Sequence, residues 1–350
     1  MPSLTASLCR NSGNYLNHTK DLGYRMGEFA VPPVADADAS AVLSCLKRHY
    51  GSSTDVASLV PRKNEAEIRA DLRRVAPSIA ALGADIFRAL QTRYSAVVVR
   101  RMHLDRFDVP TQSFLLLAMS LAMGTPTPTD KIKQRIVWDV RPRQLPPGYV
   151  STFSENDAEA DLHTDTQYFP RPERFTLLYF VRAARCGGGV SMLRDVGCVK
   201  RQLSETAEGS WAADYLSRQE LPFRIPTTYT TTGRQGTVEA TFATVLGEHP
   251  LIRYRTDTLA AGLKAFPDYD TPRTRRALAV LRDVLADQSK MFVEHFGDDA
   301  LVVTNNHVGL HGRTAFTDQQ RHVLRIRIAD GSEQAVKARV VLDRDYPEAA

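Results

Sequence analysis

The part of the sequence from about residue 136 onward consists of short runs rich in β-branched and aromatic residues, and this pattern constrains the fold most. Turn-forming residues separate the runs, as is typical of the strands of a β-sandwich or barrel. A helical pattern at about 271–296, with apolar residues at Leu278, Leu281 and Leu285, interrupts them. The predicted strands are IVWDV, FTLLYFV, VSMLR, TVEATF, LIRYRT, LVVTN and HVLRIRI.

The first part of the sequence, 1–135, is mainly helical by the spacing of its apolar residues. The β-branched run SAVVVRRM (95–102) in its middle predicts a buried strand. Helices followed by many short strands predict an α+β protein, which we interpret as one domain over 1–350 with the helical part packed on a strand core at 136–330. The predicted helices are 39–50, 65–94 and 110–124.

The composition is that of an ordinary globular protein, with 43% hydrophobic and 24% charged residues in 350. No apolar run approaches the about 18 residues that cross a bilayer, so no membrane partner is expected. The first twenty residues lack the pattern of a secretory signal. Cys9, Cys45, Cys186 and Cys198 are too scattered for a disulfide framework. These features predict a reduced protein in the cytoplasm.

The net charge is +5 and the isoelectric point is near 9.0. The basic residues are spread among 40 acidic ones, whereas nucleic-acid-binding proteins gather theirs on one face or in runs. A mildly basic surface, or an anionic co-substrate, explains the balance without a nucleic-acid partner. No pattern indicates the oligomeric state.

His163 and Asp165 stand two residues apart in DLHTDTQYFP. On a β-strand such residues point to one face, so an imidazole and a carboxylate can converge on one metal ion. His311 can supply a third ligand, and two histidines with one carboxylate form the facial triad of non-haem Fe(II) oxygenases. A second such pair, His103 and Asp105, lacks these downstream partners, and we interpret it as a strand end followed by a polar loop.

Two arginines, Arg321 and Arg325, follow His311 on a predicted strand. Their spacing places both guanidiniums on one face of that strand. A planar guanidinium forms a bidentate, charge-assisted pair with a carboxylate, which suits the distal carboxylate of 2-oxoglutarate. Taken alone, an arginine-rich strand is equally typical of a solvated sheet edge.

With these motifs in place, the chain resembles the clavaminate synthase and taurine dioxygenase branch of the Fe(II)/2-oxoglutarate oxygenases. The resemblance extends over about residues 151–328 and implies a double-stranded β-helix, or jelly-roll, flanked by helices. The matching pieces are HTD (163–165), CGGGVS (186–191), HGRTAF (311–316), RHVLR (321–325) and Asn306.

The resemblance also implies the roles of individual residues. His163, Asp165 and His311 would bind the iron, and Arg321 would pair with 2-oxoglutarate. Ser191 would stand at a hydroxyl position, usually threonine, that hydrogen-bonds the same co-substrate carboxylate. Arg325 would point towards the substrate or the other end of the co-substrate, and it is the alternative carboxylate partner.

The reaction implied by the resemblance consumes 2-oxoglutarate and O2 and releases succinate and CO2. Hydroxylation of a small amino-acid-like or natural-product substrate is the default outcome, with desaturation, epoxidation or cyclisation as variants. Halogenation is disfavoured, because a halide needs the coordination position of Asp165. Two other classes stay open: a cupin-like isomerase or hydrolase with Zn or Mn, and a non-catalytic jelly-roll that binds a small molecule.

Overall fold

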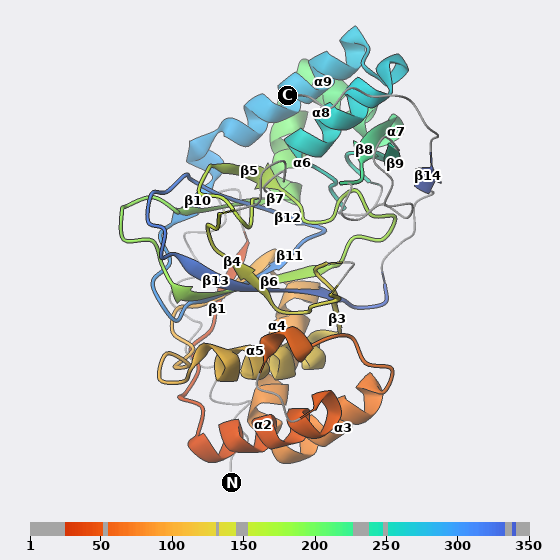
Figure 1. Ribbon diagram of the computed structural model, residues 1–350. Coiled ribbons are helices and arrows are strands. Elements are labelled where there is room, and N and C mark those ends of the chain that lie inside the picture. The colour runs from red at the N-terminus through yellow and green to blue at the C-terminus, as the bar shows by residue number, and fades with distance from the viewer. Residues whose placement is uncertain are drawn as a thin grey trace.

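The computed structural model describes residues 25–51, 55–130, 133–144, 153–226, 238–247 and 251–332, and the backbone of 338–340. In these residues two β-sheets lie one above the other between two groups of helices (Figure 1). Helices from the first part of the chain cover the outer face of the larger sheet, and helices from the second part cover the smaller one. The chain has a mixed α and β architecture, as the sequence predicts.

The larger sheet has seven strands in the order β1-β2-β11-β6-β13-β3, with β4 also paired to β13. Its centre is almost fully buried, because helices pack on one face and the smaller sheet on the other. This explains why β6 reads FTLLYFVR, a nearly continuous apolar run, rather than an alternating one. The strands are β1 Met26–Glu28, β2 Ala96–Val99, β3 Thr125–Thr127, β4 Trp138–Val140, β6 Phe175–Arg182, β11 Leu301–Asn305 and β13 His322–Ala329.

The first part of the chain contains β2, the strand predicted at 95–102, and also contributes β1 and β3, which were not predicted, to the larger sheet. The stretch 65–94 forms two helices rather than one, since Pro77 begins a new helix directly after Ala76. No helix in the described residues is both long and apolar enough to cross a bilayer. The helices of this layer are α2 Asp36–Tyr50, α3 Glu65–Val75, α4 Pro77–Thr92 and α5 Val109–Met123.

The smaller sheet has four strands in the order β10-β7-β12-β5. Its strands are antiparallel, and β12 lies in the interior between β7 and β5. The apolar residues between the two sheets include Phe180 and Leu193. The strands are β5 Ala160–His163, β7 Ser191–Asp195, β10 Phe292–Glu294 and β12 Gly309–Arg313.

The outer layer over the smaller sheet differs from the expected single helical insert at 271–296. The described residues of the second part of the chain contain four helices, and the last one ends at Ala286. A short 3-10 turn, Gln288–Lys290, follows it, and β10 then pairs with β7. A third sheet, β14-β9-β8, lies beside these helices. The elements are α6 Val196–Ser204, α7 Ala207–Arg218, α8 Thr256–Ala265, α9 Pro272–Ala286, β8 Glu220–Arg224, β9 Glu239–Thr244 and β14 Ala338–Val340.

Candidate functional site

Two histidines lie directly opposite each other in the smaller sheet. His163 is the last residue of β5, and its partner across the antiparallel pair is His311 of β12. Opposed residues of antiparallel strands project to the same face, and the two imidazole ring centroids lie 4.5 Å apart. The pairing of two distant segments therefore brings two ring nitrogens to one point.

Asp165 completes the group from a turn rather than from the strand on which the sequence analysis placed it. β5 ends at His163, and Thr166 has a left-handed backbone, with φ of 52°. The carboxylate Oδ1 lies 3.8 Å from His163 Nε2, and Oδ2 lies 3.9 Å from His311 Nε2. Each of the three side chains offers one potential ligand atom, and these atoms all lie within 4.8 Å of one another.

Asn306 fixes the backbone of this turn. Its Oδ1 accepts from the Asp165 amide at 2.7 Å, and its Nδ2 donates to the carbonyls of Asp165 at 3.0 Å and Glu173 at 2.8 Å. Thr176 also donates its hydroxyl to the Asp165 carboxylate at 3.2 Å. The position of the carboxylate therefore depends on a buried amide that contributes no potential metal ligand.

Burial and a nearby guanidinium set the protonation of the group. Burial lowers the pKa of His163 well below its usual value and lowers that of His311 in the same direction. Burial alone would raise the pKa of Asp165, but the positive charge of Arg325 helps hold it well below its usual range. At neutral pH the group therefore has two neutral imidazoles and one carboxylate, the state that binding of a divalent cation requires.

The hydrogen bond made by His163 fixes its tautomer. Its Nδ1 lies 2.6 Å from the carbonyl oxygen of Asp161, which can only accept, so Nδ1 carries the proton. Nε2 is then unprotonated and faces the Asp165 carboxylate and His311. A histidine that binds a metal through one nitrogen commonly donates the other to a carbonyl in this way.

The group lies in a pocket between the two sheets. β6 and β13 of the larger sheet and β5, β7 and β12 of the smaller sheet contribute its walls. The lining residues are Val140, Phe153, Ser154, Ala160, His163, Asp165, Leu178, Phe180, Ser191, His311, Gly312, Arg313, Arg321, Val323 and Arg325.

Arg321 is a buried cation in this pocket without a compensating acid. Its residue is only 5% exposed, and its Nε and Nη1 have no hydrogen-bond partner among the described residues. Its guanidinium lies over the rings of Phe316 at 5.0 Å and Phe180 at 5.8 Å. Burial lowers its pKa to about 9, which leaves it charged at neutral pH. Unpaired buried charges are costly, so this side chain is suited to an anion that enters the pocket.

Arg325 and Ser191 line the same pocket in different settings. Arg325 Nη1 lies 3.7 Å from Asp165 Oδ1, so this guanidinium faces the His-Asp-His group. Ser191 opens β7 opposite Arg313 of β12. Arg321 itself lies one residue before β13 begins at His322, rather than on the predicted strand with Arg325.

Two buried arginines, Arg313 and Arg253, hold the loops around the pocket. The sequence analysis did not assign them this role. Arg313 donates to the carbonyls of Phe153, Asn156 and Ala158 at 2.6–2.8 Å. Arg253 donates to carbonyls of the segment after Asp165, those of residues 167, 169 and 170, at 2.7–3.1 Å. No sequence pattern indicates such contacts, because each arginine serves a loop that is distant in the sequence.

Replacement of Asn306 by alanine should weaken metal binding without unfolding the protein. The turn that presents Asp165 would lose three hydrogen bonds, and loss of such an outer partner typically costs about 10–100-fold in metal affinity. Titration of Fe(II) under anaerobic conditions would measure this change. The matched control is Asn64→Ala, since Asn64 lies at the start of α3 with contacts to His49 and Glu67. Equal Fe(II) affinity in both variants would contradict the role of Asn306.

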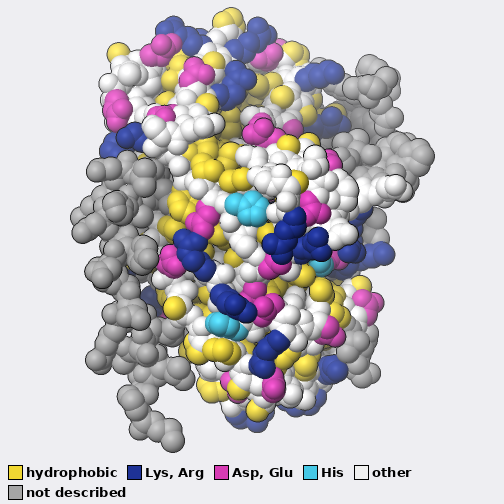
Figure 2. All heavy atoms as spheres, turned by 90° about the vertical axis from the view of Figure 1, so that its left-hand side faces the viewer, with side chains coloured by type: hydrophobic (Ala, Val, Ile, Leu, Met, Phe, Trp, Pro, Cys, Tyr) yellow, Lys and Arg dark blue, Asp and Glu magenta, His cyan; other side chains and the backbone are white. Residues whose placement is uncertain are grey.

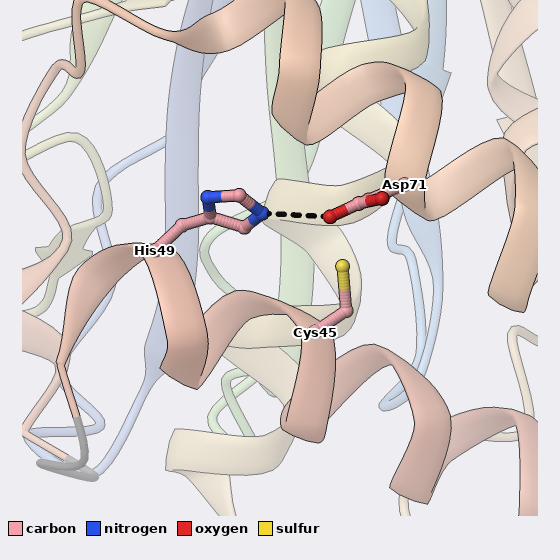
Figure 3. Close-up of side chains that lie close together, drawn as sticks. All are labelled: Cys45, His49 and Asp71. Carbon is pink, nitrogen blue, oxygen red and sulfur yellow. Dashed lines mark hydrogen bonds and ion pairs between the residues drawn. The ribbon is translucent and has the colours of Figure 1, made fainter.

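A second group of potential ligands, Cys45, His49 and Asp71, joins α2 to α3 (Figure 3). His49 Nε2 lies 3.1 Å from Asp71 Oδ2, and the guanidiniums of Arg48 and Arg74 contact the same carboxylate. Burial raises the pKa of the Cys45 thiol, which favours the protonated form. Two adjacent positive charges and a protonated thiol oppose binding of a divalent cation, so these contacts serve to pack the helices.

The other histidine–aspartate pair lies outside the pocket. The backbone amides of His103 and Leu104 donate to the carboxylate of Asp299 at 2.6 and 2.8 Å. His103 has a left-handed backbone, with φ of 57°. It follows the end of β2 in a loop, as expected from the sequence.

On the face shown in Figure 2, basic and acidic side chains are interspersed.

Solved structures share this architecture. An asparagine oxygenase in complex with Fe(II), 3-hydroxyasparagine and succinate aligns with a TM-score of 0.60 and 18% identity, over 87% of this chain and 93% of that one. The non-heme iron oxygenase OrfP in complex with Fe and α-ketoglutaric acid aligns with a TM-score of 0.57 and 16% identity, over 88% and 94%. OrfP with Fe, succinate and (3S)-hydroxy-L-Arg gives 0.55 and 15%, over 88% and 94%. These likenesses show the fold.

A search of curated proteins gives no significant match. The family described as "Taurine catabolism dioxygenase TauD, TfdA family" matches residues 55–327, which is most of the chain. The match begins well before the motifs at 163–191 and includes Arg321 and Arg325. The resemblance and the enzyme class expected from the sequence, a 2-oxoglutarate-dependent non-haem iron dioxygenase, are thereby confirmed, and the chain belongs to the TauD/TfdA family.

Proposed function

We propose that this dioxygenase binds Fe(II) through His163, Asp165 and His311 and binds the distal carboxylate of 2-oxoglutarate through Arg321. The observation that carries this proposal is the pairing of a convergent His-Asp-His group with an unpartnered buried guanidinium in one pocket. A cation site and an anion site side by side suit a metal ion and a dicarboxylate that chelates it.

The donor set fits Fe(II). Two imidazoles and one carboxylate are the ligands of the facial triad in non-haem iron oxygenases, which leaves three coordination positions free. Two of these suit a bidentate 2-oxoacid and the third suits O2. Asp165 stays ionised, and the carbonyl of Asp161 holds the His163 ring in the tautomer that presents Nε2.

The co-substrate residues divide their work by position. Arg321 has no acidic partner among the described residues, so its guanidinium can donate hydrogen bonds to the distal carboxylate. Ser191 can donate its hydroxyl to the same carboxylate. Arg325 lies beside Asp165 and therefore stabilises negative charge near the metal. Fe(II) held by these residues would, with 2-oxoglutarate and O2, supply the chemistry that oxidises a C–H bond of the substrate. The apolar side chains of Leu178, Phe180 and Val323 limit water around the reacting groups.

The substrate is proposed to be small and amino-acid-like. The asparagine oxygenase structure contains 3-hydroxyasparagine, and one OrfP structure contains (3S)-hydroxy-L-Arg. We also propose that the two facing sheets are the walls of a double-stranded β-helix, since the pocket lies between them. Location in the cytoplasm, one domain over the whole chain and absence of a nucleic-acid partner stay predictions.

The direct test is succinate release from 2-oxoglutarate in the presence of Fe(II), O2 and a panel of amino acids. We expect at least one amino acid to raise the rate of succinate formation above the substrate-free rate. A metal-dependent isomerase or hydrolase would convert its substrate without consuming 2-oxoglutarate. Conversion of an amino acid with no succinate formed would therefore contradict the proposal.

The product is expected to be heavier than the substrate by one oxygen atom, or lighter by two hydrogens. Because the Asp165 carboxylate occupies a metal position, no position is left for a halide once 2-oxoglutarate and O2 are bound. Mass spectrometry of reactions run in chloride and in bromide would measure this. A halogenated product from the unmodified enzyme would show that Asp165 does not bind the iron.

A further inference from the structure

The segment before α8 is hydrogen-bonded to the chain directly after β5. The Thr164 amide donates to the Tyr254 carbonyl at 2.9 Å, and the Tyr254 amide donates to Thr164 Oγ1 at 3.2 Å. Arg255, the next residue along this segment, has an extended backbone, with φ of −165° and ψ of 120°. His163 precedes Thr164 and lies opposite His311 in the smaller sheet. The backbone of Arg255 therefore lies beside the end of β5 that carries the His-Asp-His group.

Contacts of the Arg255 side chain agree with this placement. Its guanidinium lies over the Phe153 ring at 4.5 Å, and that ring lies 5.4 Å from the His163 ring. Phe153 lines the pocket, and the Arg255 side chain is only 15% exposed. The Phe153 ring thus lies beside both the Arg255 guanidinium and the His163 ring, which brings this cation to the edge of the pocket.

The pairing of Arg255 leaves one of its nitrogens available. Nε and Nη2 donate to the two oxygens of Asp257, each at 2.8 Å. Among the described residues none pairs with Nη1. Asp257 is about half exposed, whereas Arg255 lies against the pocket wall. The ion pair thus fixes the orientation of the guanidinium and leaves a donor for a ligand.

The charge of the loaded pocket favours an anion. The two negative charges of 2-oxoglutarate balance those of Fe(II). The pocket lining then has three arginines, Arg313, Arg321 and Arg325, and one acid, Asp165, so it keeps a net positive charge. A substrate with net negative charge would be attracted to it, and Arg255 lies at the edge where such a charge can be bound.

We propose that Arg255 determines specificity by binding, through Nη1, an anionic group of the substrate: a carboxylate or a phosphate. This inference rests on the proposed function and names the substrate class of the same pocket. The enzyme then selects a small amino-acid-like substrate with an acidic end over its neutral counterpart.

The test uses three matched pairs of probes: L-aspartate and L-asparagine, L-glutamate and L-glutamine, and O-phospho-L-serine and L-serine. Each is titrated into the anaerobic protein loaded with Fe(II) and 2-oxoglutarate, and its dissociation constant is read from the visible charge-transfer absorption. We expect at least one acid to bind about 10- to 100-fold more tightly than its neutral counterpart, as for one hydrogen bond to a charged group. The pair that shows this preference tells whether the bound group is a carboxylate or a phosphate.

Arg255→Gln should abolish this preference, and Arg255→Lys, which keeps the charge, should retain part of it. Arg275→Gln is the matched control, because Arg275 makes the same two-point pair with Asp270 on exposed α9 and should keep the wild-type preference. The inference is overturned if no acid binds more tightly than its neutral counterpart, or if the preference persists in Arg255→Gln. Failure of the wild-type protein to form the charge-transfer absorption would instead refute the proposed function itself.

Discussion

Asp165→Ala is expected to abolish Fe(II) binding and substrate-dependent turnover. The change leaves two neutral imidazoles beside the guanidinium of Arg325, so the remaining group would repel a cation rather than attract it. Loss of an outer partner of a metal ligand costs about 10–100-fold in affinity, and loss of the charged ligand itself should cost about a thousandfold or more. Iron content and succinate formation measure the two effects separately.

The control for this variant is His103→Ala, which alters the other histidine–aspartate pair in the sequence. His103 lies in a loop outside the pocket, and its side chain is no part of the convergent group. We expect its iron content and turnover to match those of the wild-type protein. Iron retained by Asp165→Ala but lost from His103→Ala would overturn the assignment of the site.

Arg321→Ala is expected to raise the apparent KM for 2-oxoglutarate far more than that for the substrate. The guanidinium is buried without an acidic partner, so the bound carboxylate would lose its charge partner. Removal of one member of a buried pair typically costs about 2–5 kcal/mol, which corresponds to about 30- to 5000-fold. Ser191→Ala should act in the same direction more weakly, since it removes one hydrogen bond.

Arg321→Ala and Arg325→Ala are expected to have different effects on the KM for 2-oxoglutarate. Arg325 already faces the Asp165 carboxylate, so Arg325→Ala should alter turnover and metal affinity more than the KM for 2-oxoglutarate. If Arg325→Ala gives the large effect on the co-substrate and Arg321→Ala does not, the choice between them is wrong.

The central strands and the three convergent residues could be predicted from the sequence. Strands such as β6 and β11 are dense in β-branched and aromatic residues, and this local pattern suffices to identify them. The three residues could be predicted to converge because the pair His163 and Asp165, unlike His103 and Asp105, is followed by His311 and two arginines in the order of the family that the chain resembles.

Features that depend on distant contacts could not be predicted. Asp165 lies in a turn whose geometry comes from Asn306, 141 residues away; the family resemblance marks this asparagine but not what it binds. Arg255 lies near the site only because its segment is hydrogen-bonded to Thr164, directly after β5. The helices α6, α7 and α8 were missed, since their mixed polar and apolar residues gain stability from packing on neighbouring helices and strands rather than from intrinsic propensity.

The most direct test of the central claim is anaerobic titration of 2-oxoglutarate into protein loaded with Fe(II), followed by visible absorption. If His163, Asp165 and His311 leave adjacent positions on the metal for the 2-oxoacid, a charge-transfer absorption should appear and saturate at one 2-oxoglutarate per chain. Arg321→Ala should need a far higher concentration to reach the same absorption. Absence of this absorption from wild-type protein that contains Fe(II) would contradict the account.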